Sequence, residues 1–100
     1  MSKFALLVRL ATDRMDAAAE RMRKAQLAHT QAENTLEQIK GYISDYQQRM
    51  LSLGQSGTSV AQWADYRLFL QKLDEAHAQQ SREVDRSLQR RQVVRRHGRT

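Results

Sequence analysis

The sequence is 100 residues long, with 17 Lys and Arg against 11 Asp and Glu, a net charge of +6, and 40% hydrophobic residues interrupted throughout by charge. A chain this short forms at most one small domain and cannot enclose a large core, and the charges exclude a membrane span. Without cysteine it has no disulfides or thiolate metal sites. Abundant Ala, Gln, Glu, Arg and Leu without proline favour helix, so we expect a soluble all-α protein.

A long helix is predicted from about residue 2 to about residue 52. Apolar residues recur there at alternating steps of four and three, a coiled-coil repeat interrupted only by His29. At 1.5 Å per residue this helix spans roughly 75 Å. The short apolar run near its start is followed closely by Asp13 and Asp16, so we expect no secretion signal and place the chain in the cytoplasm. The repeat consists of Phe4, Val8, Ala11, Met15, Ala18, Met22, Ala25, His29, Ala32, Leu36, Ile39, Ile43, Tyr46, Met50 and Leu53.

The turn is predicted at about residues 53–59, which contain two glycines and small polar residues, with Thr58 or Ser59 capping a second helix at about 60–97. A loop this short favours an antiparallel neighbour, so the whole chain is predicted to be one antiparallel two-helix coiled-coil hairpin. The second repeat consists of Trp63, Tyr66, Leu70, Leu73, His77, Gln80 and Val84.

The register is predicted by centring the turn near residue 56, which also sets His29 near Val84 and directs His77 and Gln80 at Ala32 and Leu36. Helix 1 then outruns its partner, and we expect its first turns to fray, to belong to a shortened hairpin or to be covered by another subunit. The predicted pairs are Met50 with Trp63, Ile43 with Leu70, Ile39 with Leu73, and Leu36 with His77.

Two aromatic residues, Tyr42 and Phe69, fall beside the seam at equivalent flanking heptad positions. The predicted register sets them at nearly the same height, where they would form a partly exposed apolar patch beside Tyr46. Such a patch is typical of a protein docking site. The alternative is that these rings only thicken a narrow core.

Catalytic chemistry finds no support in the sequence. There is no phosphate-binding glycine loop, and the predicted pairing separates His29 from His77, so we expect no metal, cofactor or small-molecule substrate. A two-helix hairpin also lacks a concave pocket that could exclude water around a nucleophile. We therefore predict that the protein is not an enzyme.

Seven arginines crowd the last fifth of the chain, from Arg82 to Arg99, which favours a polyanion or an acidic protein surface as a neighbour. The simpler interpretation is a solvated helix end whose cations suit the helix dipole. Nucleic acid binding is a competing hypothesis, but aromatic residues for base stacking are missing from this segment, so we do not expect a nucleic acid partner. A coiled coil that only self-associates is a third interpretation.

Four segments together resemble one protein family: DAAAERMRKAQ, QAENTLEQIKGYISDYQQRML, GTSVAQW and WADYRLFLQKLDEAHAQQ. Their order and spacing are similar to the FliJ family of the bacterial flagellar type III export apparatus, across residues 1 to about 90. The related YscO-type proteins of injectisomes are the alternative. The W-x-x-Y-x-x-F pattern in the last segment favours the flagellar system.

The resemblance implies a stalk-like hairpin whose open end inserts into the export ATPase ring, a hexamer, and whose flank contacts the export gate protein FlhA. It also implies a part in recycling export chaperones and a peripheral place at the cytoplasmic face of the inner membrane. Two departures are Gln80, where some members have histidine, and a second helix shorter than usual in the family. The implied gate-binding residues are Ile39, Tyr42, Tyr46, Phe69, Leu73, Ala76 and Gln80, and the open-end residues are Phe4, Leu7, Val8 and Ala11.

Overall fold

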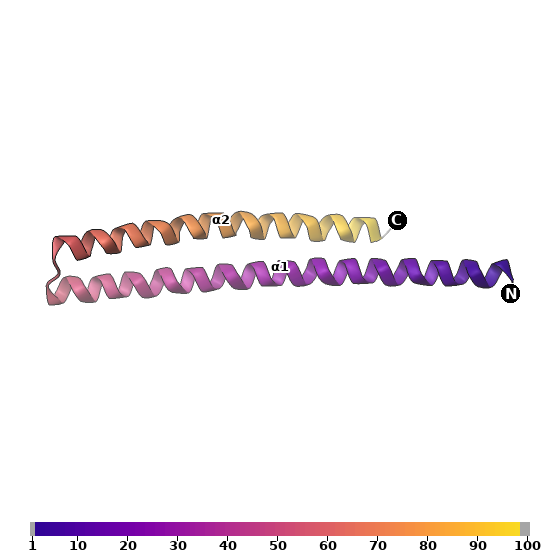
Figure 1. The fold of residues 1–100 in the computed structure, drawn as a ribbon, viewed down its shortest axis with the longest axis horizontal. Helices are drawn as coiled ribbons and strands as arrows, with labels where there is room; N and C mark the ends of the chain where they lie inside the picture. Colours follow the sequence, from indigo (N-terminus) through magenta and orange to yellow (C-terminus); the bar gives the residue numbers. More distant parts are fainter. Residues whose placement is uncertain (1, 99–100) are drawn as a thin grey trace.

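Two long antiparallel helices lie side by side and make up the molecule (Figure 1). The computed structural model describes residues 2–98, with α1 at Lys3–Ser56 and α2 at Val60–Gly98. The rod measures 83 × 16 × 16 Å, so it is long and only two helices thick. The prediction of an all-α, antiparallel two-helix coiled-coil hairpin is confirmed.

The first helix, α1, runs unbroken for 54 residues. Ser2 caps its start, because the Ala5 backbone N–H donates to Ser2 Oγ at 3.2 Å. Gly41 lies within the helix with open space around it, and the absence of proline leaves nothing to kink the rod. The sequence therefore forms the single long helix that the repeat predicted.

The turn consists of Gly57, Thr58 and Ser59. Gly57 adopts a φ of 86°, which an L side chain disfavours, and so ends α1. The Thr58 hydroxyl donates to the Leu53 carbonyl at 2.7 Å and satisfies one of the last free carbonyls of α1. Ser59 and Gln62 form a reciprocal capping box, with Gln62 N–H donating to Ser59 Oγ at 3.2 Å and Ser59 N–H to Gln62 Oε1 at 3.4 Å.

The predicted end of helix 1 near residue 52 is wrong, because α1 continues through Gly54 to Ser56. The predicted turn at 53–59 is accordingly too long. Trp63 packs over this last turn, with its Cζ3 atom 3.8 Å from the place that a Cβ on Gly54 would occupy. The indole therefore lies against the backbone of Gly54, and the turn centres on residue 58 rather than near 56.

The longer α1 shifts the register by about three residues from the prediction. His29 Nδ1 lies 2.9 Å from Ser87 Oγ, so His29 pairs with Ser87 and not with Val84. Continued along the rod, the register of His29 and Ser87 places Ile43 nearer the level of Leu73 than that of Leu70. Because three residues are close to one helical turn, the predicted stripes still face each other in the new register.

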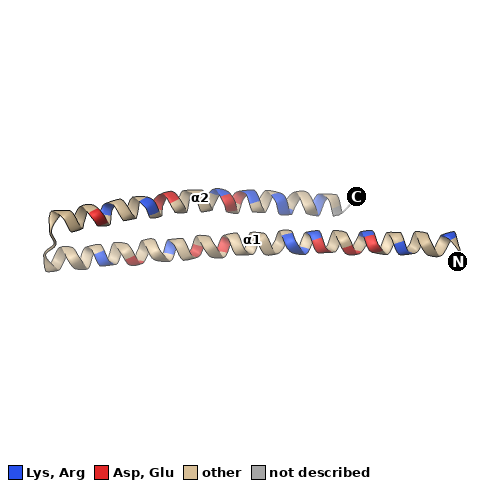
Figure 2. Ribbon diagram, viewed as in Figure 1, with Lys and Arg blue, Asp and Glu red and all other residues tan. Residues whose placement is uncertain are grey.

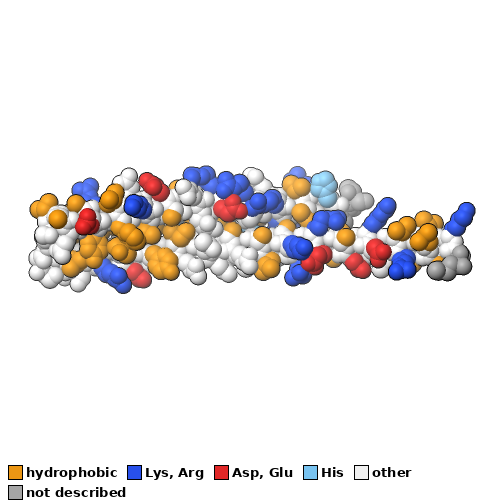
Figure 3. All heavy atoms as spheres, in the orientation of Figure 1, with side chains coloured by type: hydrophobic (Ala, Val, Ile, Leu, Met, Phe, Trp, Pro, Cys, Tyr) orange, Lys and Arg blue, Asp and Glu red, His pale blue; other side chains and the backbone are white. Residues whose placement is uncertain are grey.

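The core is thin. Among the described residues, only His29, Ala32 and Ser87 are fully buried, and the remaining seam residues between Ala18 and Val94 are half-buried apart from Met22 and Trp63. Figure 3 shows hydrophobic side chains gathered between the helices in the part nearest the turn, and again at the N-terminal end of α1. Large side chains therefore pack between the helices in the half of the rod next to the turn, which we call the turn half. In the other half, which we call the open half, the side chains between the helices are mostly small.

The N-terminal part of α1 projects beyond the end of α2 (Figure 1). All residues from 3 to 17 are exposed, including Phe4 at 73% and Met15 at 73%. Near the end of α2, Arg91 and Arg95 line a hollow together with Met22 of α1. The described part of α2 therefore ends only a short way beyond the level of Met22. The expectation that helix 1 outruns its partner is confirmed, and within residues 2–98 no part of α2 covers the apolar stripe of its projecting part.

Candidate partner-binding surfaces

The aromatic residues beside the seam form a stacked cluster. The rings of Tyr46 and Phe69 stack with centroids 4.3 Å apart, and Tyr66 packs against Tyr46 at 5.5 Å. The Arg49 guanidinium lies 5.8 Å from the centre of the Tyr46 ring, a cation–π contact. Tyr42 and Phe69 remain 60% and 41% exposed. We call Tyr42, Tyr46 and Phe69 the aromatic flank, and it joins both helices in one apolar surface.

The prediction that Tyr42 and Phe69 share one height is wrong in detail. In the observed register Phe69 lies level with about residue 47, so Tyr46 and not Tyr42 stacks on it. Tyr42 lies about one helical turn further along α1. The flank is therefore elongated along the rod, with an exposed phenol at one end and a stacked pair at the other.

The other residues predicted for this surface lie at its inner edge. Ile39, Leu73 and Ala76 are half-buried along the seam. Gln80 is also half-buried, and its side-chain amide donates to the Ala32 carbonyl at 3.0 Å, so it faces Ala32 as predicted. This hydrogen bond joins the two helices, so the Gln80 amide already has a partner within the hairpin.

The predicted open-end surface lies on the projecting part of α1. Phe4, Leu7 and Val8 are 73%, 64% and 50% exposed, and Ala11 is exposed beside them. Phe4 and Tyr42 are separated by roughly 57 Å of helix at 1.5 Å per residue. The rod therefore presents two apolar surfaces far apart on one element.

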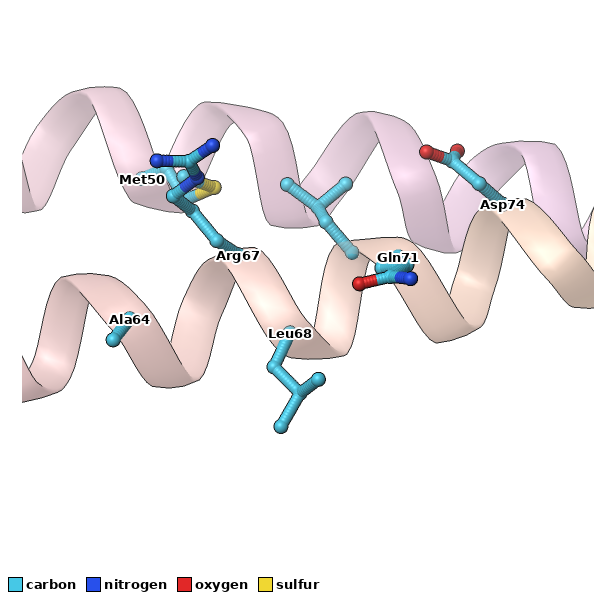
Figure 4. Close-up of a pocket in the computed structure, with 7 residues that line it drawn as sticks. Met50, Ala64, Arg67, Leu68, Gln71 and Asp74 are labelled. Atoms are coloured by element: carbon cyan, nitrogen blue, oxygen red, sulfur yellow. The ribbon is translucent and has the colours of Figure 1, made fainter.

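The flank opposite the aromatic residues carries a shallow groove of about 660 Å³. Met50 and Leu70 form its floor, and Figure 4 shows Arg67 and Asp74 extending from α2 toward α1 while Leu68 points away. The arrangement is open and lacks a nucleophile paired with a base. It is a surface hollow between two helices and carries no catalytic arrangement.

A polar layer lies in the open half of the seam. The Ser87 hydroxyl donates to the Val84 carbonyl at 2.8 Å, and Ser87 Oγ lies within hydrogen-bond distance of His29 Nδ1, at 2.9 Å; the tautomer of the ring sets which of these two atoms is the donor. On the other side of the ring, His29 Nε2 lies 3.1 Å from Glu33 Oε1. Every buried polar side-chain atom among the described residues has a hydrogen-bond partner. This layer fixes one register, because sliding the helices would leave its atoms unpaired.

Charge is unevenly distributed, with Lys and Arg frequent along the C-terminal half of α2 (Figure 2). Hydrogen bonds from Arg86 and Arg90 lower the pKa of the Glu83 carboxyl, with Oε1 2.6 Å from Arg90 and Oε2 2.9 Å from Arg86. A hydrogen bond from Arg23 likewise lowers the pKa of Glu20. These pairs, and those of His29 with Glu33 and of Lys40 with Glu37, each join residues of the same helix.

Within residues 2–98 no three His, Asp or Glu side chains are grouped closely enough to hold a metal ion. Neither described helix contains a stretch apolar enough to span a membrane.

Comparison with known families finds a match over residues 1–97 to the family described as Flagellar FliJ protein. The chain belongs to the FliJ family. Neither the curated proteins nor the solved structures yield a match. The FliJ match spans both helices, so the aromatic flank and the open-end surface both lie inside it. Membership makes the protein a component of the flagellar export apparatus, in a family of non-enzymatic components.

Sequence reasoning missed two contacts of this FliJ-family hairpin. Ser87 follows Val84 by three residues, so the alternating repeat already contained the signal for its place in the seam. The contact of Arg49 with Tyr46 had no such signal, because a flanking arginine in a coiled coil ordinarily faces solvent. The first of these residues completes the polar layer, and the second borders the aromatic flank.

Proposed function

We propose that this FliJ-family protein is a stalk-like adaptor that binds the export gate protein FlhA through the aromatic flank and the export ATPase ring through its open end. It carries no catalytic activity of its own. It acts at the cytoplasmic face of the inner membrane and helps to recycle export chaperones. The observation that carries this proposal is the pair of exposed apolar surfaces separated by roughly 57 Å on one rod.

The gate-binding role rests on the exposure of aromatic side chains that a two-helix core does not need. Tyr42 is 60% exposed, and the stacked Phe69 is still 41% exposed. Exposed aromatic rings beside an arginine are typical of residues that carry most of the binding energy in protein interfaces. Ile39, Leu73 and Ala76 supply a half-buried apolar edge, while Gln80 contributes through the shape of the seam.

The ATPase-binding role rests on the projecting part of α1. Phe4, Leu7 and Val8 lie on a helix that lacks an intramolecular partner there, and an isolated helix of this length is marginal in water. Contact with a subunit ring would bury these side chains and order the helix. The unbroken α1 links this end mechanically to the aromatic flank.

The decisive experiment measures binding of the purified chain to the cytoplasmic part of FlhA by calorimetry. The test variant is Tyr42→Ala with Phe69→Ala, and the matched control is Leu51→Ala with Leu68→Ala, which are 69% and 55% exposed but lie away from the aromatic flank. We expect the test variant to lose at least about tenfold in affinity, and the control to keep wild-type affinity. Circular dichroism of each variant reports helicity.

Gate binding that is equally strong in both variants would contradict the proposed docking site. Loss of helicity in the test variant would mean that the two rings are core residues instead. A separate measurement addresses the open end: Phe4→Ser with Leu7→Ser should abolish stimulation of the export ATPase while gate binding persists. Leu6→Ser with Leu10→Ser, on another face of the same turns, is its control.

A further inference from the structure

A second groove lies on the same side of the rod as the aromatic flank, in the open half of the hairpin. Its volume is about 780 Å³, and its floor consists of Ala25 and Ala28 from α1 with Val93 and Val94 from α2. Val93 is 48% exposed. Because the α1 side chains here are alanines, the two helices leave a hollow where larger residues would have filled the space.

Cations stand on both walls of this groove. Lys24 lines it from α1, and Arg86 and Arg90 line it from α2. The two arginine side chains are 60% and 61% exposed. Glu83 is the common acidic partner of the two arginines. On α1, Arg23 and to a smaller extent Lys24 lower the pKa of Glu20, so three cations around the groove are matched by two carboxylates and leave an excess of positive charge. An occupant that fits this groove would have an apolar stripe to cover the floor and carboxylates on both sides of the stripe to face the cations.

We propose that this groove binds an amphipathic, acidic α-helix of a partner protein, which lies along the rod as a third helix. The apolar stripe of the helix would cover Ala25, Ala28 and Val93, and its carboxylates would face Lys24, Arg86 and Arg90. This goes beyond the gate and ATPase contacts proposed above, because it uses neither the aromatic flank nor the open-end residues.

A helix is the favoured occupant because of the shape of the groove. The hollow runs between two helices, where the ridge of a third helix packs, and helix-in-groove docking buries one apolar stripe in this way. A nucleic acid would use the arginines but not the apolar floor. Segments 18–34 and 82–98, which form this part of the rod, also contain no Phe, Trp or Tyr for base stacking.

The position of the groove leaves the aromatic flank free. Ala28 and Tyr42 occupy equivalent positions two heptads apart, so they lie on the same side of α1 about 21 Å from each other. A 21-residue helix is about 31 Å long, so when centred on the groove it would extend about 16 Å to either side and end short of Tyr42. The hairpin could hold this helix and the gate at the same time.

The test uses a yeast-displayed library of 21-residue helices and the full 100-residue chain as the labelled target. The library fixes Leu, Val or Ala along one stripe and randomises the flanking positions among Glu, Gln, Lys and Ala. We expect the recovered binders to be enriched in Glu beside the stripe. Recovery of no binders, or of binders without that enrichment, would overturn the proposal.

Variants of the hairpin then locate the site by fluorescence anisotropy with a recovered peptide. Arg86→Gln with Arg90→Gln should weaken binding about tenfold, whereas Arg82→Gln with Arg96→Gln, the same change in charge outside the groove, should change it less than about twofold. Equal losses in the two variants would refute a defined site. Circular dichroism should show unchanged helicity, since glutamine is a good helix former.

Two further variants, with Asp85→Asn as a control, keep the test independent of any effect of the arginine changes on folding. Glu83→Gln removes the carboxylate that competes for both arginines, so it should tighten binding about threefold, while Asp85→Asn should have little effect. Val93→Asn should weaken binding about tenfold through the apolar floor. Unchanged affinity in both Glu83→Gln and Val93→Asn would overturn the proposal.

Two other occupants are outcomes of the same experiment. Displacement of the peptide by a 20-base-pair DNA duplex, with DNA binding weakened more by Arg86→Gln with Arg90→Gln than by Arg82→Gln with Arg96→Gln, would assign the groove cations to nucleic acid. Sedimentation showing a dimer of the wild-type chain that Val93→Asn dissociates would assign the groove to a second copy. Either result would refute the acidic helix, and neither would bear on gate binding through Tyr42 and Phe69.

Discussion

Truncation of Ser87 to alanine should destabilise the hairpin more than its small size suggests. Ser87 is 2% exposed, donates to the Val84 carbonyl and lies 2.9 Å from His29 Nδ1. Alanine would leave Nδ1 of a histidine whose side chain is only 8% exposed without its partner. A buried polar group without a partner costs about 1–3 kcal/mol. The unfolding free energy should fall by that amount, and the melting temperature by roughly 4–8 °C per kcal/mol.

Removing both partners tests the energetic role of this polar layer most sharply. His29→Leu with Ser87→Ala replaces the polar layer by apolar side chains, which leaves no buried group unpaired and should restore or exceed wild-type stability. The assay is urea and thermal unfolding followed by circular dichroism, for wild type, both single variants and the double variant. Ser44→Ala, at an exposed position on α1, is the control and should change the unfolding free energy by less than about 0.5 kcal/mol.

Two results would refute this account of the polar layer. One is a Ser87→Ala variant as stable as wild type, which would mean that water or a shifted ring satisfies His29 without cost. The other is a double variant less stable than Ser87→Ala, which would mean that the layer contributes net stability rather than register.

Three further predictions concern the backbone and the surface charge. Gly57→Ala should lower the unfolding free energy by about 1–2 kcal/mol, because the φ of 86° at the turn disfavours a side chain, as thermal unfolding would show. Gly41→Ala should instead raise it by about 0.5–1 kcal/mol in the same assay, since the space around Gly41 is open and the site is helical. The pKa of Glu83 is lowered by Arg86 and Arg90, so its stabilising effect is present above the ordinary pKa of 4.5 and is lost as the pH falls through the lowered value. The difference in helicity between wild type and Glu83→Gln at pH 7 should therefore disappear on acidification, and a difference that persists at pH 2 would contradict this.

The fold was predictable because one signal dominates the sequence. A seven-residue repeat sustained from Phe4 to Leu53 leaves few alternatives to a coiled coil, and the glycines near residue 57 mark one turn. The register was not predictable to better than about one turn, since it depends on which glycine ends α1. Gly54 and Gly57 look alike in sequence, but in the structure Gly54 is helical and lies against Trp63, whereas Gly57 has a φ of 86° and ends α1.

The sequence predicted which residues line the candidate surfaces, but it did not predict which of their side chains touch each other. Heptad positions identified Tyr42 and Phe69 as residues beside the seam, but the error in register paired the wrong tyrosine with Phe69. The groove at Val93 had no sequence signal, because it arises where alanines on one helix meet valines on the other. Side-chain volumes on both helices, at a known register, were needed to find it.

The distribution of large and small seam residues also has a mechanical consequence. Near the turn, Ile43 and Leu70 fill the seam, while toward the open end alanine recurs at every seventh residue up to Ala32. Fewer atoms in contact mean less resistance to twisting, because dispersion contacts are individually weak and act by their number. A torque applied at the open end would therefore twist mainly the open half of the rod, where the seam contains the alanines. The third of the rod that carries Tyr46 and Phe69 would keep its shape under that load.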